Sequence, residues 1–282
     1  MKLNLFNYKS EVVDALQYNF SLREKEQIFF SLISHFGSIS KVDFLISSSN
    51  EVSEKLEKDI LNAIGKLNQG IPLQHITQIG YFRDLELFVN ENVLIPRPET
   101  EELVSLVLEE LSSHAKVLDL GTGSGCISLS IKSEFPEAII TGIDLSEKAL
   151  EVAKQNGQKL DLDVSFLHLS MTEKLTQLGM FDILISNPPY IGKEEEKELD
   201  DNVVLHEPHM ALFSDTEDPL YFYKLIYERA LDNLVDGGFL FLELHENYSE
   251  STKQIFITNE FKDVEILTDL QGKLRFLKAQ KA

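Results

Sequence analysis

The 282-residue sequence contains a single cysteine, Cys126, and no tryptophan. One thiol excludes an internal disulfide and is typical of proteins from a reducing compartment. No apolar run approaches the roughly 20 residues that a membrane-spanning helix needs, and polar residues interrupt the N-terminal segment too early for a signal peptide. These absences predict a cytoplasmic protein that makes no contact with a membrane.

Basic residues are scarce as well. The chain has 26 Lys and Arg against 47 Asp and Glu, for a formal charge of −21. Because nucleic-acid affinity comes largely from Lys and Arg that neutralise phosphates, this balance weighs against a broad duplex-binding surface. We expect a small molecule or a basic protein as the partner, no direct nucleic acid, and a monomer. Residues 191–220 hold ten acidic residues and two lysines. This stretch is predicted to be a solvated surface, with docking of a basic partner as the alternative.

The N-terminal quarter of the chain has the pattern of amphipathic helices. Apolar residues recur at i, i+3, i+4 and i+7 in segments 10–20, 22–37 and 52–70. Ser21 and Ser53 are expected N-caps. Residues 1–75 are therefore predicted to form a small helical domain that docks a substrate, with no catalytic group of its own.

Residues 76–96 change to short alternating runs with "RD" and "NEN" as turn signals, which predicts a β-hairpin linker. Residues 97–282 are predicted to form one domain, in which strand-like and helix-like segments alternate from Lys116 onward. This alternation is typical of an α/β fold with a parallel, Rossmann-like sheet covered on both faces. The last segment, "DVEILTDLQGKLRFLKA", is predicted to close the sheet as an antiparallel hairpin.

A glycine-rich turn, "GTGSG", follows the first of these strands. Gly121, Gly123 and Gly125 would let a ligand approach the backbone closely, beside the free N–H groups at the start of a helix. The dinucleotide-binding fingerprint needs its third glycine three residues after the second, where this chain has Cys126. The departure favours a different nucleoside cofactor, and Cys126 is expected to be a small core residue.

An acidic residue, Asp144, ends the next predicted strand, 19 residues after Gly125. A carboxylate at this place can accept hydrogen bonds from both hydroxyls of a ribose. The alternative is a helix N-cap, which Ser146 could supply instead. Together with the glycine turn, Asp144 indicates a nucleoside site.

The stretch "SNPPYI" follows another apolar strand and forms a rigid corner, since two prolines continue neither a strand nor a helix. The side-chain carbonyl of Asn187 and the next backbone carbonyl can both accept hydrogen bonds. Two acceptors that converge on an –NH₂ group would fix its nitrogen, and Tyr190 offers a flat face for stacking. A tight turn with a capping Asn is the alternative.

Three of these motifs, "VLDLGTGSG", "GIDLSEKAL" and "SNPPY", resemble those of class I S-adenosylmethionine-dependent methyltransferases that methylate amide or amino nitrogens. Four more, "GIPLQHI", "VLIPRPETEELV", "HEPHMALF" and "TDLQGKLRF", resemble those of the HemK-type protein-(glutamine-N5) methyltransferases. That family modifies the Gln of the Gly-Gly-Gln motif in peptide-chain release factors. The resemblance covers nearly all of residues 70–280.

The resemblance implies a cofactor, S-adenosyl-L-methionine, and a set of site residues. Arg97 and Glu99 would line the substrate pocket, and Met171-Thr172 stands where many relatives have an acid and an aromatic beside the adenine. His245 replaces a glycine of the relatives. The implied cofactor-binding residues are Gly121, Thr122, Gly123, Ser124, Gly125, Asp144, Thr172 and Asn187; the substrate-binding ones are Asn187, Pro188, Pro189 and Tyr190, of which Asn187, Pro188 and Tyr190 are catalytic.

Three other hypotheses remain. His206 and His209 invite a metal site, but Pro208 interrupts a helical ligand face and no Cys or further His lies nearby, so no metal is predicted. The nearest rival function is a DNA or RNA adenine or cytosine amino-N-methyltransferase that acts on a flipped base, which should carry a basic recognition region. The third hypothesis is that the chain is a non-catalytic nucleoside-binding protein.

Overall fold

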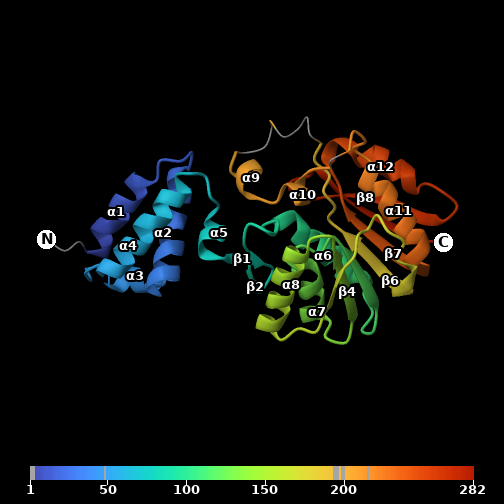
Figure 1. The fold of residues 1–282 in the computed structure, drawn as a ribbon, viewed down its shortest axis with the longest axis horizontal. Helices are drawn as coiled ribbons and strands as arrows, with labels where there is room; N and C mark the ends of the chain where they lie inside the picture. Colours follow the sequence, from blue (N-terminus) through green and yellow to red (C-terminus); the bar gives the residue numbers. More distant parts are fainter. Residues whose placement is uncertain (1–3, 48, 193–196, 198–200, 215) are drawn as a thin grey trace. The chain divides into compact units, whose positions relative to one another are not determined.

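The computed structural model describes residues 4–47, 49–192, 197, 201–214 and 216–282 (Figure 1). The acidic stretch 191–220 was predicted to be a solvated surface, but most of its acidic residues lie outside the described residues. The contacts divide the chain into two compact units, the smaller made of Met1–Gln78 with Asp200–His206 and the larger of Ile79–Leu199 with Glu207–Ala282. The hairpin expected as a linker is grouped with the larger unit, and residues 200–206 join the helical one.

The smaller unit is helical. The expected N-caps at Ser21 and Ser53 form, and the second helix has the predicted bounds. Ser21 also forms a capping box with Glu24. The first helix was placed wrongly at 10–20, because Asn4 caps it and Leu5 already belongs to its buried face. Its helices are α1 (Leu5–Ala15), α2 (Leu22–Gly37), α3 (Lys41–Ser47), α4 (Glu54–Leu67), α5 (Leu73–Thr77) and α9 (Asp201–His206).

The larger unit contains a seven-stranded sheet in the order β5-β4-β3-β6-β7-β9-β8. The first five strands of that order are parallel, and β9 pairs antiparallel with both β7 and β8, so the predicted Rossmann-like sheet and its terminal hairpin are confirmed. The strands are β3 (Lys116–Leu120), β4 (Ile139–Asp144), β5 (Ser165–His168), β6 (Phe181–Ser186), β7 (Leu234–Glu243), β8 (Phe261–Thr268) and β9 (Leu274–Lys281).

Helices cover both faces of this sheet, as Figure 1 shows. Consecutive residues of β3 enter the cores on opposite faces of the sheet. Val117 packs with the helices α6 to α8, and Leu118 packs with α11 and α12. A strand buried on both faces needs a continuous apolar run, which is what the sequence has there. The helices are α6 (Pro98–Glu110), α7 (Cys126–Glu134), α8 (Glu147–Leu160), α10 (His209–Leu212), α11 (Tyr221–Asn233) and α12 (Ser249–Phe256), with 3-10 turns η1 (Thr176–Leu178) and η3 (Glu246–Tyr248).

A separate two-stranded hairpin precedes the sheet. Its strands β1 (Ile79–Phe82) and β2 (Leu85–Phe88) pair antiparallel around Arg83, which has φ = 50°. The predicted "RD" turn is confirmed. Among the helices of the described residues, none is long and apolar enough to cross a membrane.

The strand order fixes where a ligand can bind. The chain runs from β3 to β4 on one side and later returns to β6 on the other side of β3. Such a reversal leaves a crevice at the carboxyl ends of the strands, where open α/β sheets bind their ligands.

Candidate active site

A cavity of about 360 Å³ lies at this carboxyl edge. Residues that follow β3, β4, β5 and β6 line it, together with two further segments, 91–94 and 208–211. The second lies within the motif "HEPHMALF", and the first overlaps the start of "VLIPRPETEELV". Of the eight predicted cofactor-binding residues, the lining includes Gly121, Gly123, Asp144, Thr172 and Asn187.

The glycine turn holds its backbone open to the cavity. Gly123 has φ = 55°, and a Cβ added there would meet no atom within 4 Å, so the backbone faces open space. Gly125 has a different role: its Cβ would come within 3.0 Å of the ring of Phe166. We conclude that Gly121 and Gly123 leave room for a ligand, whereas Gly125 leaves room for the core.

Thr122 and Ser124 are buried and are not among the residues that line the cavity. The hydroxyls of Thr122 and Ser128 both donate to Oδ2 of Asp119, each over 2.7 Å. Asp119 is fully buried at the end of β3, and burial raises its pKa to about 6 although these two hydrogen bonds oppose the shift.

This raised pKa predicts a pH-dependent stability. A carboxyl that keeps its proton to a higher pH when folded makes the free energy of unfolding fall as pH rises from about 4 to about 6. Relative to Asp119→Asn, the wild type should therefore lose up to about 3 kcal/mol over this window, and nothing further above it. Urea unfolding of both proteins between pH 4 and pH 8 checks this. A difference that is the same at every pH would contradict the raised pKa.

Asp144 stands opposite the glycine turn at the end of β4. Its Oδ2 accepts from the backbone N–H of Gly123 over 2.9 Å, and its Oδ1 accepts from that of Ser146 over 2.8 Å. Burial raises the pKa of this carboxyl, and these backbone hydrogen bonds oppose the shift. Ser146 itself caps α8 by accepting from Ala149. The carboxylate keeps further lone pairs with which it can accept hydrogen bonds from a ligand.

The segment after β6 contributes unequally. Asn187 and Pro189 line the cavity, and Pro188 is buried. Tyr190 is outside the lining; its hydroxyl donates to Oε1 of Glu243 over 2.9 Å, and its ring meets that of His245 edge-on at 5.7 Å. A stacking role for Tyr190 stays a prediction.

Two buried polar residues that the sequence analysis missed hold this corner. Nδ2 of Asn187 donates to Oγ1 of Thr100 over 3.1 Å, and that hydroxyl donates to Oε2 of Glu243 over 2.7 Å. Burial raises the pKa of Glu243, and the hydrogen bonds from Thr100 and Tyr190 oppose the shift. The available signals were the threonine of "IPRPETE" and an acid that ends the apolar strand "FLFLE".

Arg97 and Glu99 do not line the cavity. Arg97 instead pairs with Glu207, Nη2 to Oε1 over 2.6 Å, and the N–H of Ile95 donates to the other carboxylate oxygen over 3.1 Å. The Glu207 side chain is 1% exposed, so its charge depends on these donors. Because Ile95 directly follows segment 91–94 and Glu207 directly precedes segment 208–211, these contacts hold the two lining segments next to each other.

The remaining lining comes from residues after β5 and from α11. Thr172 and Met171 are both present, and Oγ1 of Thr172 lies 2.7 Å from Oγ of Ser170. The cavity is also lined by the aromatic residue Phe222, although the residue directly after Thr172 in the sequence is not aromatic.

The histidines considered for a metal have other contacts. Nε2 of His206 lies 3.1 Å from the carbonyl oxygen of Gln69, and the ring of His209 stacks on Phe213 at 4.4 Å. Within the part of the chain that the structure describes, no group of three or more His, Cys, Asp or Glu could hold a metal ion.

Comparison with known proteins identifies the class first. The family model "Methyltransferase small domain" matches residues 99–217. The crystal structure of a methyltransferase from Pyrococcus furiosus aligns with a TM-score of 0.54, covering 80% of this chain and 98% of that one at 19% sequence identity, which shows the fold. The larger unit has the class I methyltransferase fold.

The family follows from closer relatives. The release factor glutamine methyltransferase of Flavobacterium psychrophilum is 37% identical over 279 residues, which are 96% of this chain and 97% of that protein. The protein of the same name from Streptococcus pneumoniae is 38% identical over 85% of this chain and 86% of its own. This chain belongs to the release factor glutamine methyltransferase family and is an enzyme.

Proposed function

We propose that the protein transfers a methyl group from S-adenosyl-L-methionine to the side-chain amide nitrogen of the Gln in the Gly-Gly-Gln motif of peptide-chain release factors. The observation that carries the proposal is the position of Asn187, whose amide is held at the edge of the same cavity as Gly121, Gly123 and Asp144. The names of the relatives support the choice of acceptor.

The residues of the cavity fit the cofactor. Gly121 and Gly123 would hold its methionine part, with open space at Gly123, and Asp144 would accept from the ribose hydroxyls. Thr172 and Phe222 would lie beside the adenine. When bound, S-adenosylmethionine supplies an electrophilic methyl group on a positively charged sulfur.

The protein's own contribution is to position a poor nucleophile. An amide nitrogen is weakly nucleophilic because its lone pair is delocalised into the carbonyl. Oδ1 of Asn187 and the carbonyl of Pro188 would accept the two N–H groups of the substrate amide and so fix its orientation. Alignment of this kind contributes roughly 7–11 kcal/mol. Both acceptors bind more tightly as positive charge develops on the nitrogen, so they favour the transition state over the bound substrate.

The experiment that tests this function uses labelled S-adenosylmethionine and a purified release factor, either wild type or with its motif Gln changed to Ala. Label on the wild-type factor alone is the expected result. Label on neither factor, although the cofactor binds, would contradict the proposal. Label on DNA or RNA in the same assay would favour the amino-N-methyltransferase alternative, and cofactor binding with no acceptor at all would favour the non-catalytic one.

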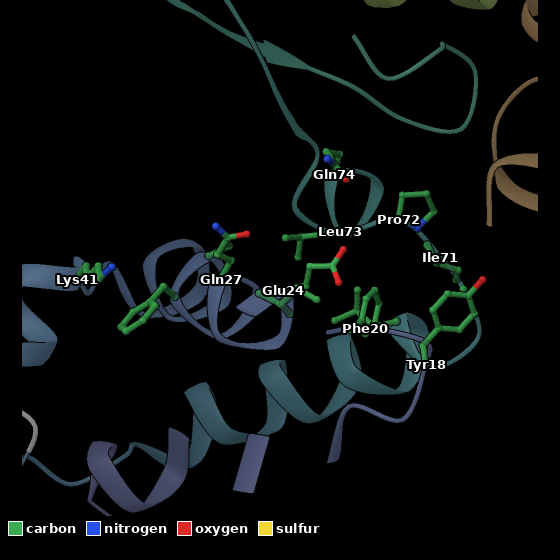
Figure 2. A pocket seen from close by; sticks show the side chains of 14 residues that line it. Tyr18, Phe20, Glu24, Gln27, Lys41, Ile71, Pro72, Leu73 and Gln74 are labelled. Carbon is green, nitrogen blue, oxygen red and sulfur yellow. The ribbon is translucent and has the colours of Figure 1, made fainter. Parts of the chain in front are cut away.

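The helical unit is proposed to dock the body of the release factor. A groove of about 610 Å³ lies within this unit, between residues of α2 and the segment 70–74 (Figure 2). Its wall is largely apolar, and Glu24, Gln27 and Lys41 add polar groups. Residues 1–78 carry eight Lys and Arg and nine Asp and Glu, so nearly all of the charge of −21 lies outside them. An apolar contact therefore suits this groove better than an electrostatic one.

A bulky side chain in the groove should separate docking from chemistry. Ser31 is exposed and lines the groove. Ser31→Trp is expected to raise KM for a full-length release factor by about tenfold, the equivalent of about 1.4 kcal/mol. KM for a short peptide that contains Gly-Gly-Gln should not change. Asn62→Trp, at an exposed position of α4 outside the groove, is the matched control. An equal rise for both substrates, or none, would argue against docking here.

We also propose that the enzyme works in the cytoplasm, as a monomer and without bound nucleic acid. The single cysteine and the charge of −21 support this. Light scattering of the purified protein, with and without a release factor, measures the oligomeric state directly.

A further inference from the structure

Asn187 is the first member of a chain of hydrogen bonds that ends at a buried carboxylate. Its Nδ2 donates to Oγ1 of Thr100 over 3.1 Å, and Thr100 donates to Oε2 of Glu243 over 2.7 Å. The other oxygen of Glu243 accepts from the hydroxyl of Tyr190 over 2.9 Å. Thr100 and Glu243 are each 2% exposed, so water cannot replace these contacts.

The hydrogen bonds that run from Asn187 through Thr100 to Glu243 all point the same way, each group donating to the next. Both carboxyl oxygens of Glu243 accept hydrogen bonds, Oε2 from Thr100 and Oε1 from Tyr190, so Thr100 uses its single proton toward Glu243. Its oxygen can then only accept from Asn187, which means that the –NH₂ end of the Asn187 amide must face Thr100. The carbonyl end is left to face the other way. If the Asn187 amide were turned over, its carbonyl would face an oxygen that has no proton to give.

We infer that Thr100 and Glu243 are positioning residues that set the orientation of the Asn187 amide, so that Oδ1 rather than Nδ2 is presented to the substrate. This inference rests on the proposed function, because an acceptor at that point is useful only for a substrate that offers N–H groups. The same polarity would reject a Glu carboxylate in place of Gln, since two acceptors would then face each other without a proton.

A turned amide would still bind a glutamine, with its –NH₂ group donating to the substrate's carbonyl, but the substrate nitrogen would be misplaced. Loss of the Thr100 hydroxyl should therefore lower the rate of methyl transfer far more than it raises KM. A residue that served stability alone would not separate the two quantities in this way.

Thr100→Val and Thr100→Ser form the matched pair for the test. Valine keeps the shape and loses the hydroxyl, whereas serine keeps the hydroxyl and loses only a methyl group. We expect Thr100→Val to slow single-turnover transfer to a release factor by about 10- to 100-fold, typical of an outer residue that orients a reacting group. KM for the release factor and the affinity for the cofactor should stay within about threefold of the wild-type values, which is a change of less than about 1 kcal/mol in binding free energy. Thr100→Ser should transfer at nearly the wild-type rate.

Two results would overturn the inference and leave the proposed function intact. One is a wild-type rate in Thr100→Val. The other is an equally slow Thr100→Ser, which would mean that packing and not the hydroxyl is needed. If the wild-type enzyme itself transfers no label, the proposed function fails instead.

A measurement on the wild-type protein tests the orientation without any substrate. In protein labelled with ¹⁵N-asparagine and with a ¹³C methyl group on threonine, the side-chain –NH₂ of Asn187 should show a nuclear Overhauser effect to the Thr100 methyl. Absence of this signal, with both resonances assigned, would overturn the inference even if no variant could be purified.

Discussion

Asn187→Ala is expected to slow methyl transfer by about 10²- to 10³-fold, the usual effect of removing one preorganised group that stabilises a transition state. The affinity for S-adenosylmethionine should change by less than about fivefold, or about 1 kcal/mol. In the proposed complex Asn187 accepts from the reacting amide itself, whereas the groups that would hold the cofactor, such as Gly123 and Asp144, remain in place. The change should therefore appear in the chemical step.

Single-turnover transfer with enzyme in excess gives the rate of that step, and calorimetry with the cofactor alone gives its affinity. Asn259→Ala, at an exposed position in the same unit, controls for the loss of an amide elsewhere. An unchanged transfer rate in Asn187→Ala would remove Asn187 from the mechanism. An equal loss of rate and of cofactor affinity would instead make it mainly a binding residue.

Parts of the fold could be read from the sequence because local pattern and tertiary structure agree there. Helix α2 has a capping box at Ser21 and ends at Gly37, and both ends were predicted. The strands β3 and β6 are short apolar runs buried on both faces, which also appear without a structure. In each case the signal lies within a few residues of the element.

Other elements depend on contacts that local pattern does not contain. The seven-residue helix α3 and the five-residue helix α5 are too short to be stable alone, so neighbours in the helical unit must stabilise them. The start of helix α1 lies five residues before the predicted one, because Asn4, whose side chain accepts from the N–H of Asn7 and caps the helix, is not among the predicted N-caps.

The candidate site shows the same division. Asp144 ends a strand of the parallel sheet, and Gly121 and Asn187 each follow one directly, so their convergence at one edge follows from the fold class. The contact between Thr100 and Glu243 joins positions 143 residues apart, and that between Arg97 and Glu207 joins positions 110 apart. Such contacts depend on the three-dimensional packing of α6 against the sheet, which no short motif encodes.

Asp144→Asn is expected to produce the opposite pattern to Asn187→Ala. The carboxylate accepts from Gly123 and Ser146 and, in the proposed complex, from the ribose hydroxyls. An asparagine has one oxygen and one –NH₂ group, so one of the two backbone N–H groups, or a hydroxyl, must face a donor. Hydrogen bonds to a charged group contribute about 1.5–3 kcal/mol each, so cofactor affinity should fall by about 10- to 100-fold.

The rate of methyl transfer at saturating cofactor should stay within about threefold of the wild type, because Asn187 and its partners are not altered. Asp163→Asn, on the exposed surface beyond α8, is the matched control. If Asp144→Asn instead lowered the saturated rate and left the affinity unchanged, the carboxylate would act in the transfer step and the ribose assignment would be wrong. Measured together, Asp144→Asn and Asn187→Ala therefore separate cofactor binding from alignment of the amide, since each is expected to move only one of the two quantities.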